Sequence, residues 1–169
     1  FNYLVGCKND KFSGYNYQVY TGPGTKYKLI KEEFYKLILK GNILYSQDEI
    51  EDIHRTADGS VINYPNKDNL IANPNQTIQG KVKSYAAFRA KAMYEWKILD
   101  NLKFTQDLSY RTKIDSTDNY FVYSKTTILS KISDIFSLGI NYKIDYVNAP
   151  PEGKKRSDKT TSINLVVNY

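Results

Sequence analysis

Few side chains in this sequence could carry out chemistry. A single cysteine, Cys7, and a single histidine, His54, exclude an internal disulfide and a Cys-rich metal site, and leave little material for histidine-based catalysis. Glu95 or Asp107 could serve as a catalytic acid, but no nucleophile, oxyanion donor or metal-binding set accompanies either residue. The sequence therefore predicts a protein that is not an enzyme and that uses no metal or cofactor.

Two segments share features with binding motifs without matching them. His54 lies in "DEIEDIHRTADGS", whose acidic residues could bind a cation, but their spacing matches no calcium motif and a solvated loop is favoured. The segment "TGPGTK" is rich in glycine, yet it lacks the Lys-Ser/Thr ending and the strand-to-helix context of a phosphate-binding loop. Gly22, Pro23 and Gly24 are better explained as a kink in a strand.

Apolar and polar residues alternate with a period of two through most of the chain. From Phe136 to Tyr146, every second residue is apolar, and the residues between are Ser, Gly, Asn, Lys and Asp. This period is typical of a β-strand whose two faces meet different environments. For residues 120–131 the pattern does not fix the phase. Eight strands are expected, at about residues 1–8, 15–29, 35–45, 88–98, 102–110, 120–131, 136–146 and 161–169.

Two of these segments also fit a helix. In "SYAAFRAKAMYEWKIL", Tyr85, Phe88 and Trp96 fall on one helical face, and "EEFYKLILKG" holds good helix formers before a possible cap at Gly41. The alternation runs through both segments without a break, and strand-like segments flank both. We therefore expect strands.

The connections between these strands are alternately long and short. The long ones include residues 47–82 and "NAPPEGKKRSD", and the short ones include "KEE", "LDN" and "ISD". In an up-and-down antiparallel sheet, alternate connections lie at the same end, so this asymmetry is typical of a barrel with short periplasmic turns and long outer loops. The predicted fold is all-β: one up-and-down antiparallel transmembrane β-barrel domain over residues 1–169, with 47–82 as a long extracellular loop.

Aromatic residues give this barrel a length. Tyr35 and Tyr45, like Phe136 and Tyr146, are ten residues apart, which spans on the order of 25 Å for tilted strands and matches an apolar membrane band between two aromatic belts. The expected lower belt contains Tyr27, Tyr35, Trp96, Phe104, Phe136 and Tyr169, and the upper belt contains Tyr15, Tyr45, Tyr110 and Tyr146.

If the apolar faces meet lipid, a set of charged residues points into the lumen. Buried charges need partners, so a salt-bridged plug is the favoured interpretation. The alternative is a narrow, anion-favouring pore lined by Arg89, Lys91, Lys125 and Lys143. The full set of lumen-facing candidates is Arg89, Lys91, Glu95, Asp107, Lys125, Lys143 and Asp145.

A soluble, lipocalin-like barrel that binds a small ligand is the competing fold. Its outer face would have to consist of Lys and Asn, while its interior absorbed most hydroxyls of the 16 tyrosines without partners. The net charge of +6 would suit an anionic partner, but the basic residues form no run. A solvated surface is therefore expected, with no nucleic-acid partner.

Several segments resemble the domain-of-unknown-function family 481, the YdiY-like salt-induced outer-membrane proteins. They are "AMYEWKILDNLKFTQDLSY", "DNYFVYSKTTILSKI", "FSLGINYKIDYVNAPPEGKKRSDKTT" and "KFSGYNYQVYTGPGTKYKLI". The resemblance implies a barrel in the outer membrane of a Gram-negative bacterium, in contact with lipid and lipopolysaccharide. It also implies further strands upstream, so that this chain is the C-terminal part of a larger barrel. It transfers no activity to any residue.

The last strand carries a second implication of the resemblance. Ile163, Leu165, Val167 and Tyr169 form its apolar row. In such outer-membrane proteins the barrel-assembly machinery reads a C-terminal aromatic strand, so these four residues are the expected assembly signal.

Overall fold

The computed structural model describes residues 1–10, 14–55, 61–62, 77–116 and 118–167. Eight antiparallel strands form one sheet in the order β1-β2-β3-β7-β8-β9-β10-β11. A separate small sheet has the order β5-β4-β6. The strands are β1 (Asn2–Asp10), β2 (Tyr15–Lys31), β3 (Tyr35–Ile50), β4 (Ile53–Arg55), β5 (Val61–Ile62), β6 (Thr77–Ile78), β7 (Val82–Leu99), β8 (Leu102–Lys113), β9 (Tyr120–Lys131), β10 (Phe136–Val147) and β11 (Ser157–Val167).

The eight predicted strands are confirmed, and both segments that also fit a helix are strands, β3 and β7. Within the described residues there is no helix. It follows that no helix there has the length and apolar character needed to cross a membrane. The strand period prevails over local helix propensity because each strand hydrogen-bonds to neighbours with the same period.

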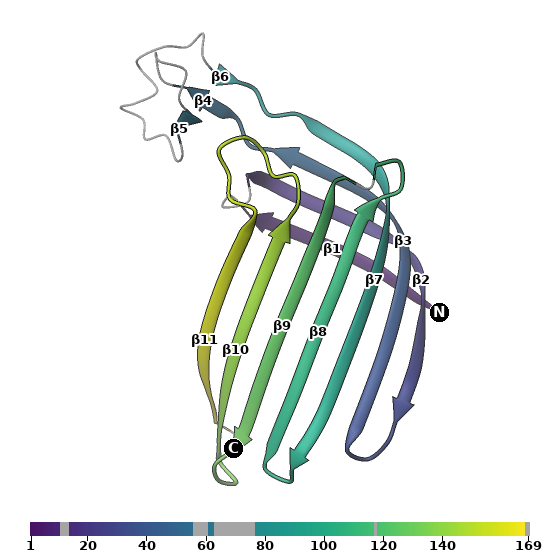
Figure 1. The fold of residues 1–169 in the computed structure, drawn as a ribbon, viewed down its shortest axis with the longest axis vertical. Helices are drawn as coiled ribbons and strands as arrows, with labels where there is room; N and C mark the ends of the chain where they lie inside the picture. The colour runs from purple at the N-terminus through teal and green to yellow at the C-terminus, as the bar shows by residue number, and fades with distance from the viewer. Residues whose placement is uncertain (11–13, 56–60, 63–76, 117, 168–169) are drawn as a thin grey trace.

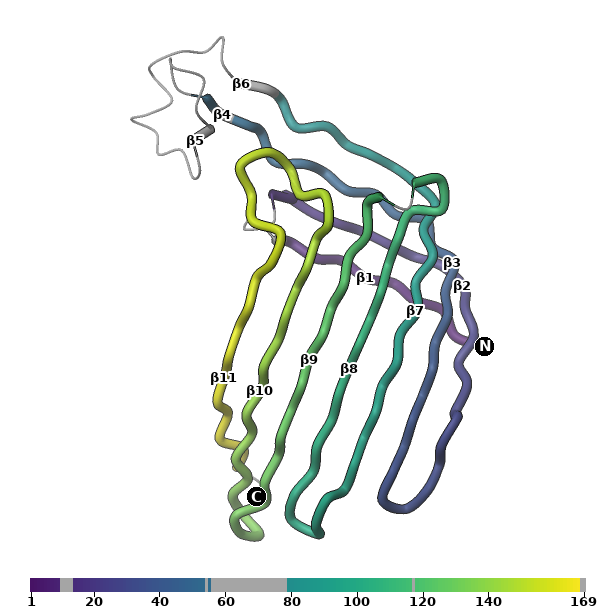
Figure 2. Tube along the Cα trace, in the orientation of Figure 1, coloured from purple at the N-terminus to yellow at the C-terminus, as the bar shows by residue number. Residues whose placement is uncertain are grey.

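The sheet curls into a half-barrel, with the long connections at one end and the tight turns at the other (Figures 1 and 2). The connection predicted over 47–82 is shorter, since β3 runs to Ile50 and β7 begins at Val82, and it contains β4 to β6. In the turn before β10, the Ser133 hydroxyl accepts hydrogen bonds from the backbone N–H groups of Ile135 and Phe136. The edge strands β1 and β11 do not pair with each other over their described residues, so this sheet is open.

The register gives the sheet an apolar convex face and a polar concave face. Along β3, Leu44 is 1% exposed whereas its neighbour Ile43 is 63% exposed, so the even-numbered residues there point inward. Cross-strand partners share a face, and the partners of the inward row continue as Ala87 on β7 and Lys113 on β8. The same rule fixes the phase of β9, because Lys125 is the cross-strand register partner of Asp107, which points inward.

One expected belt residue lies on the wrong face. Tyr15 is 4% exposed and its ring contacts Phe121 on the concave side, with 6.1 Å between ring centroids. A register shift between Tyr15 and Tyr17 reverses the alternation at the start of β2, and a β-bulge of this kind cannot be read from a period of two.

Other aromatic residues on the convex face form two rows. Near the long connections, the ring of Tyr120 lies between those of Tyr110 and Tyr146, at centroid distances of 5.6 and 6.0 Å. Near the tight turns, Tyr35 stacks on Trp96 at 6.0 Å. The two rows flank the apolar part of the convex face.

Candidate functional site

The register places the seven predicted charged residues on the concave face. Arg89, Lys91 and Glu95 come from β7, Asp107 from β8, Lys125 from β9, and Lys143 and Asp145 from β10. Consecutive strands bring these residues together because every second position faces the same side. That this face lines a closed lumen remains a prediction.

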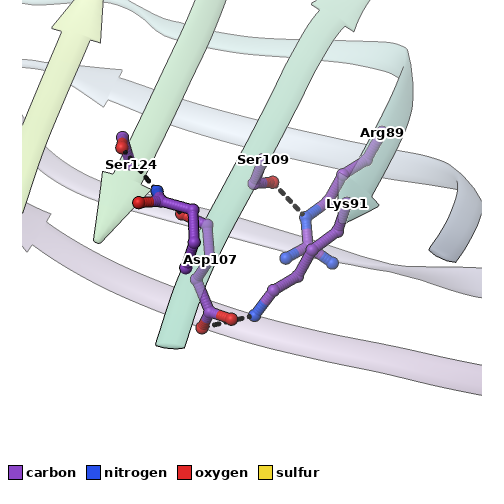
Figure 3. A network of polar contacts seen from close by, with 6 residues as sticks. Arg89, Lys91, Asp107, Ser109 and Ser124 are labelled. Atoms are coloured by element: carbon purple, nitrogen blue, oxygen red, sulfur yellow. Dashed lines mark hydrogen bonds and ion pairs between the residues drawn. The ribbon is translucent and has the colours of Figure 1, made fainter. Parts of the chain in front are cut away.

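Ion pairs connect most of these charges. Lys91 Nζ lies 3.2 Å from Asp107 Oδ2, and Figure 3 draws this ion pair. Asp145 Oδ2 lies 2.6 Å from Lys143 Nζ, and its Oδ1 lies 3.2 Å from Nζ of Lys8 on β1. The contact between β1 and β10 crosses the interior of the half-barrel, since the two strands are far apart in the strand order.

Two of the predicted residues do not belong to the cluster of ion pairs around Asp107 and Asp145. Glu95, near the tight turns, accepts Lys36 at 3.1 Å and Lys103 at 2.8 Å. Lys125 forms no ion pair in the described part of the chain, although it lies in register with Asp107 and Lys143. The ion pairs therefore form two groups: Glu95 with its two lysines at the turn end, and a larger cluster nearer the long connections.

A cavity of about 460 Å³ opens at the larger cluster. Its lining combines the paired charges with residues that sequence reasoning missed, of which Arg111 is the most unusual. Arg111 is 7% exposed, and its guanidinium carbon lies 4.8 Å from the ring centroid of Tyr20 and 4.4 Å from that of Phe121. Extending the alternation of β8 by one position, from Asp107 and Ser109, would have identified Arg111. The lining includes Lys8, Tyr20, Arg89, Lys91, Asp107, Ser109, Arg111, Phe121, Lys143 and Asp145.

Arg89 lines this cavity on the β7 side. Its Nε donates a hydrogen bond to Ser109 Oγ at 3.0 Å, and Ser109 is buried (Figure 3).

Ser124, also drawn in Figure 3, belongs to the convex face. Its hydroxyl accepts a hydrogen bond from Gln106 Nε2 at 2.9 Å, and the Thr126 hydroxyl donates one to Gln106 Oε1 at 2.6 Å. These three polar residues satisfy one another within an apolar surface.

A second cluster lies where the long connections meet the sheet. The Tyr85 hydroxyl donates to Asp48 Oδ2 at 2.6 Å, and Lys113 Nζ lies 4.3 Å from the Tyr85 ring centroid. The buried side chain of Tyr15 lies beside this cluster. A smaller cavity of about 240 Å³ lies between this cluster and Pro150 and Pro151.

The other predicted candidates are the cation-binding loop around His54 and the apolar row of the last strand. Among the described residues, no three His, Cys, Asp or Glu side chains come together as a possible metal site. His54 is in β4, but its side chain lies outside what the structure describes. Ile163, Leu165 and Val167 pair with Ile140, Leu138 and Phe136 on the convex face. Tyr169 lies outside the described residues, and the assembly signal remains a prediction.

Comparison with known proteins shows where this architecture belongs. A curated relative, "Uncharacterized protein YdiY" of Escherichia coli (strain K12), is 31% identical over 77 residues, which are 45% of this chain and 29% of that protein. The match thus spans less than a third of the relative's length. No solved structure is significantly similar to the chain. The family model described as "Protein of unknown function, DUF481" matches residues 1–169, and the chain therefore belongs to that family.

Proposed function

We propose that this protein is a bacterial outer-membrane β-barrel whose convex face meets lipid. One observation carries the proposal: large apolar side chains are exposed on the convex face of nearly every strand. Examples are Val5 at 71%, Ile43 at 63% and Ile163 at 70% exposure. Soluble monomers rarely expose contiguous apolar patches of more than a few hundred Å².

The interior supports the same proposal. Buried apolar residues are few among the described residues: Tyr15, Leu44, Tyr85, Ala87 and Val147. Buried polar ones are as prominent and include Asn42, Ser46, Asp48 and Arg111. A sheet that is apolar outside and polar inside is the reverse of a soluble domain and is typical of a barrel in lipid.

We further propose that the interior is filled with ion-paired side chains, and that the barrel has a structural or stress-response role. The pairs Lys91–Asp107 and Lys143–Asp145 extend into the concavity, and the Lys8–Asp145 pair joins β1 to β10 across it. Such cross-connections narrow the interior and hold the curl of the sheet.

A narrow, anion-favouring pore is the second candidate. It is favoured by Lys26, Lys40 and Lys91, which follow one another in register across β2, β3 and β7 on the concave face. Like charges placed directly opposite one another repel. An anion between them would relieve this repulsion, so the row would attract an anion that passes along it. A soluble barrel that binds an apolar ligand is disfavoured, because the concave face offers few apolar side chains.

Fractionation of cells that produce the protein tests the membrane proposal. The protein should appear with the outer membrane, stay there through a urea wash, and need detergent for extraction. Recovery of folded protein without detergent would favour the lipocalin-like alternative. Conductance measurements in planar bilayers then separate the two membrane candidates: a filled barrel gives no steady current, whereas the pore gives an anion-selective current that weakens in Lys91→Gln.

A further inference from the structure

Two arginines lie side by side on the concave face of the sheet. Arg89 on β7 and Arg111 on β8 are direct register partners, and both line the cavity of about 460 Å³. Like charges directly opposite each other in an antiparallel pair are destabilising. The fold nevertheless holds both cations at one wall of one cavity.

Arg111 forms no ion pair with any residue that the structure describes. It is 7% exposed, and its Nη1 atom is buried without a hydrogen-bond partner. The rings of Tyr20 and Phe121 interact with its charge, but a ring face cannot satisfy the N–H donors, which lie in the plane of the guanidinium. An unsatisfied charged donor at this depth is costly.

Two of the carboxylates near Arg111 are paired with lysines, and among the described residues no ion pair joins any carboxylate to Arg111. Asp107 pairs with Lys91, and Asp145 pairs with Lys143 and Lys8. Asp48 accepts the Tyr85 hydroxyl at Oδ2, and its Oδ1 is buried without a hydrogen-bond partner, but within the described residues no ion pair joins Asp48 to Arg111. The cavity thus keeps its lysines neutralised and its arginines available.

The Tyr20 ring that contacts Arg111 has room for its position because the residue opposite it, on β1, is a glycine. Gly6 on β1 is the register partner of Tyr20, and a side chain at Gly6 would collide with the Tyr20 ring. The missing side chain lets the ring lie over the backbone of β1, where it supports Arg111. A guanidinium fixed between rings is pre-organised, so less entropy is lost when it binds a ligand.

We propose that the cavity binds a small oxyanion, a carboxylate or phosphate group, between the guanidinium groups of Arg111 and Arg89. Arginine forks match both groups through paired N–H donors. The Arg89 guanidinium is already oriented by its hydrogen bond to Ser109. This inference does not depend on the membrane proposal, because the cavity lies on the concave face.

The test is binding of inorganic phosphate and of acetate to the purified protein in detergent micelles. Chloride keeps the ionic strength constant, and the readouts are equilibrium dialysis and the thermal unfolding midpoint. Phosphate or acetate at millimolar concentration should raise the midpoint, because a ligand that binds only the folded state stabilises it. The arm with the larger effect identifies the preferred group.

Arg111→Met should weaken oxyanion binding by at least about tenfold. Without the anion it should unfold at a higher temperature than the parent protein, because a buried unpaired charge has been removed. Arg89→Gln should weaken binding as well. Lys125→Gln is the matched control: it removes one positive charge from the same face, outside the cavity lining, and should leave binding unchanged.

Three results would overturn the proposal. They are the absence of phosphate and acetate binding by the parent protein, undiminished binding by Arg111→Met, and an equal loss in Lys125→Gln, which would indicate a general field effect. Circular dichroism of each variant shows whether the strands remain, and Arg89→Gln decides the question if Arg111→Met does not fold.

Discussion

Gly6 has a role at the residue scale that its sequence context does not reveal. A Cβ atom at this position would overlap the ring of Tyr20, whereas one at Gly139, also on the concave face, would meet its nearest atom at an ordinary 3.5 Å. Gly6→Ala should therefore lower the free energy of unfolding by about 1–3 kcal/mol, as overpacking does. Gly139→Ala is the control for backbone effects. Urea unfolding in detergent measures both, and equal effects would show that the Tyr20 ring moves aside freely.

At the scale of a strand, the two faces of β10 should respond differently to charge. Ile140 is on the convex face, midway between the aromatic rows, and Asn141 is on the concave face, where it accepts Thr127 Oγ1 at 2.6 Å. In a bilayer, Ile140→Arg should cost roughly 2–4 kcal/mol. Asn141→Arg should cost less, about the 1 kcal/mol of a lost hydrogen bond. Folding from detergent into bilayers measures both, and equal costs would mean that the convex face does not meet lipid.

The strands were the most predictable part of the fold. A period of two, repeated over eight segments, identified every strand of the large sheet, including β3 and β7, where helix propensity competed. The phase of β9 was not predictable because "YFVYSKTTILSK" has apolar and polar residues at both phases. Only its pairing with β8 and β10 fixes it. The bulge at Tyr15 escaped prediction for a related reason: an extra residue in one strand shows only against its partner.

The candidate site was less predictable than the strands. The charges on one face follow from alternation, but their partners depend on register. Lys8 meets Asp145 only because the sheet curls until β1 approaches β10. Arg111 is a site residue because Tyr20 and Phe121, from β2 and β9, lie over its guanidinium. Neither contact involves residues close in sequence, so no local pattern records it.

At the scale of the whole molecule, the placement of loops and turns is testable in cells. The long connection before β11 and the tight turn before β10 lie at opposite ends of the sheet (Figure 1). The first contains Lys155 and the second contains Asp134. In a Cys7→Ser background, Lys155→Cys should react with a membrane-impermeant thiol reagent on intact cells. Asp134→Cys should react only after the outer membrane is opened. Equal labelling of the two variants on intact cells would contradict the proposed orientation.

Assembly is the second property of the whole molecule, and it can be separated from stability. The exposed row of Ile163, Leu165 and Val167 lies on the convex face of β11, an edge strand whose far side pairs with no other strand in the described part of the chain. Free backbone groups beside an apolar row are what a machine that adds strands to a sheet would bind, and the resemblance to outer-membrane proteins adds Tyr169 to this signal. One interfacial aromatic residue contributes on the order of 1–2 kcal/mol to a finished barrel, whereas a recognition step that needs it would lose its contact completely. Tyr169→Ala should therefore lower the amount inserted in cells while the purified protein still folds in detergent. Tyr142→Ala, a convex aromatic away from the chain end, should lower stability by a similar amount without the insertion defect, and equal insertion of the two variants would remove Tyr169 from the signal.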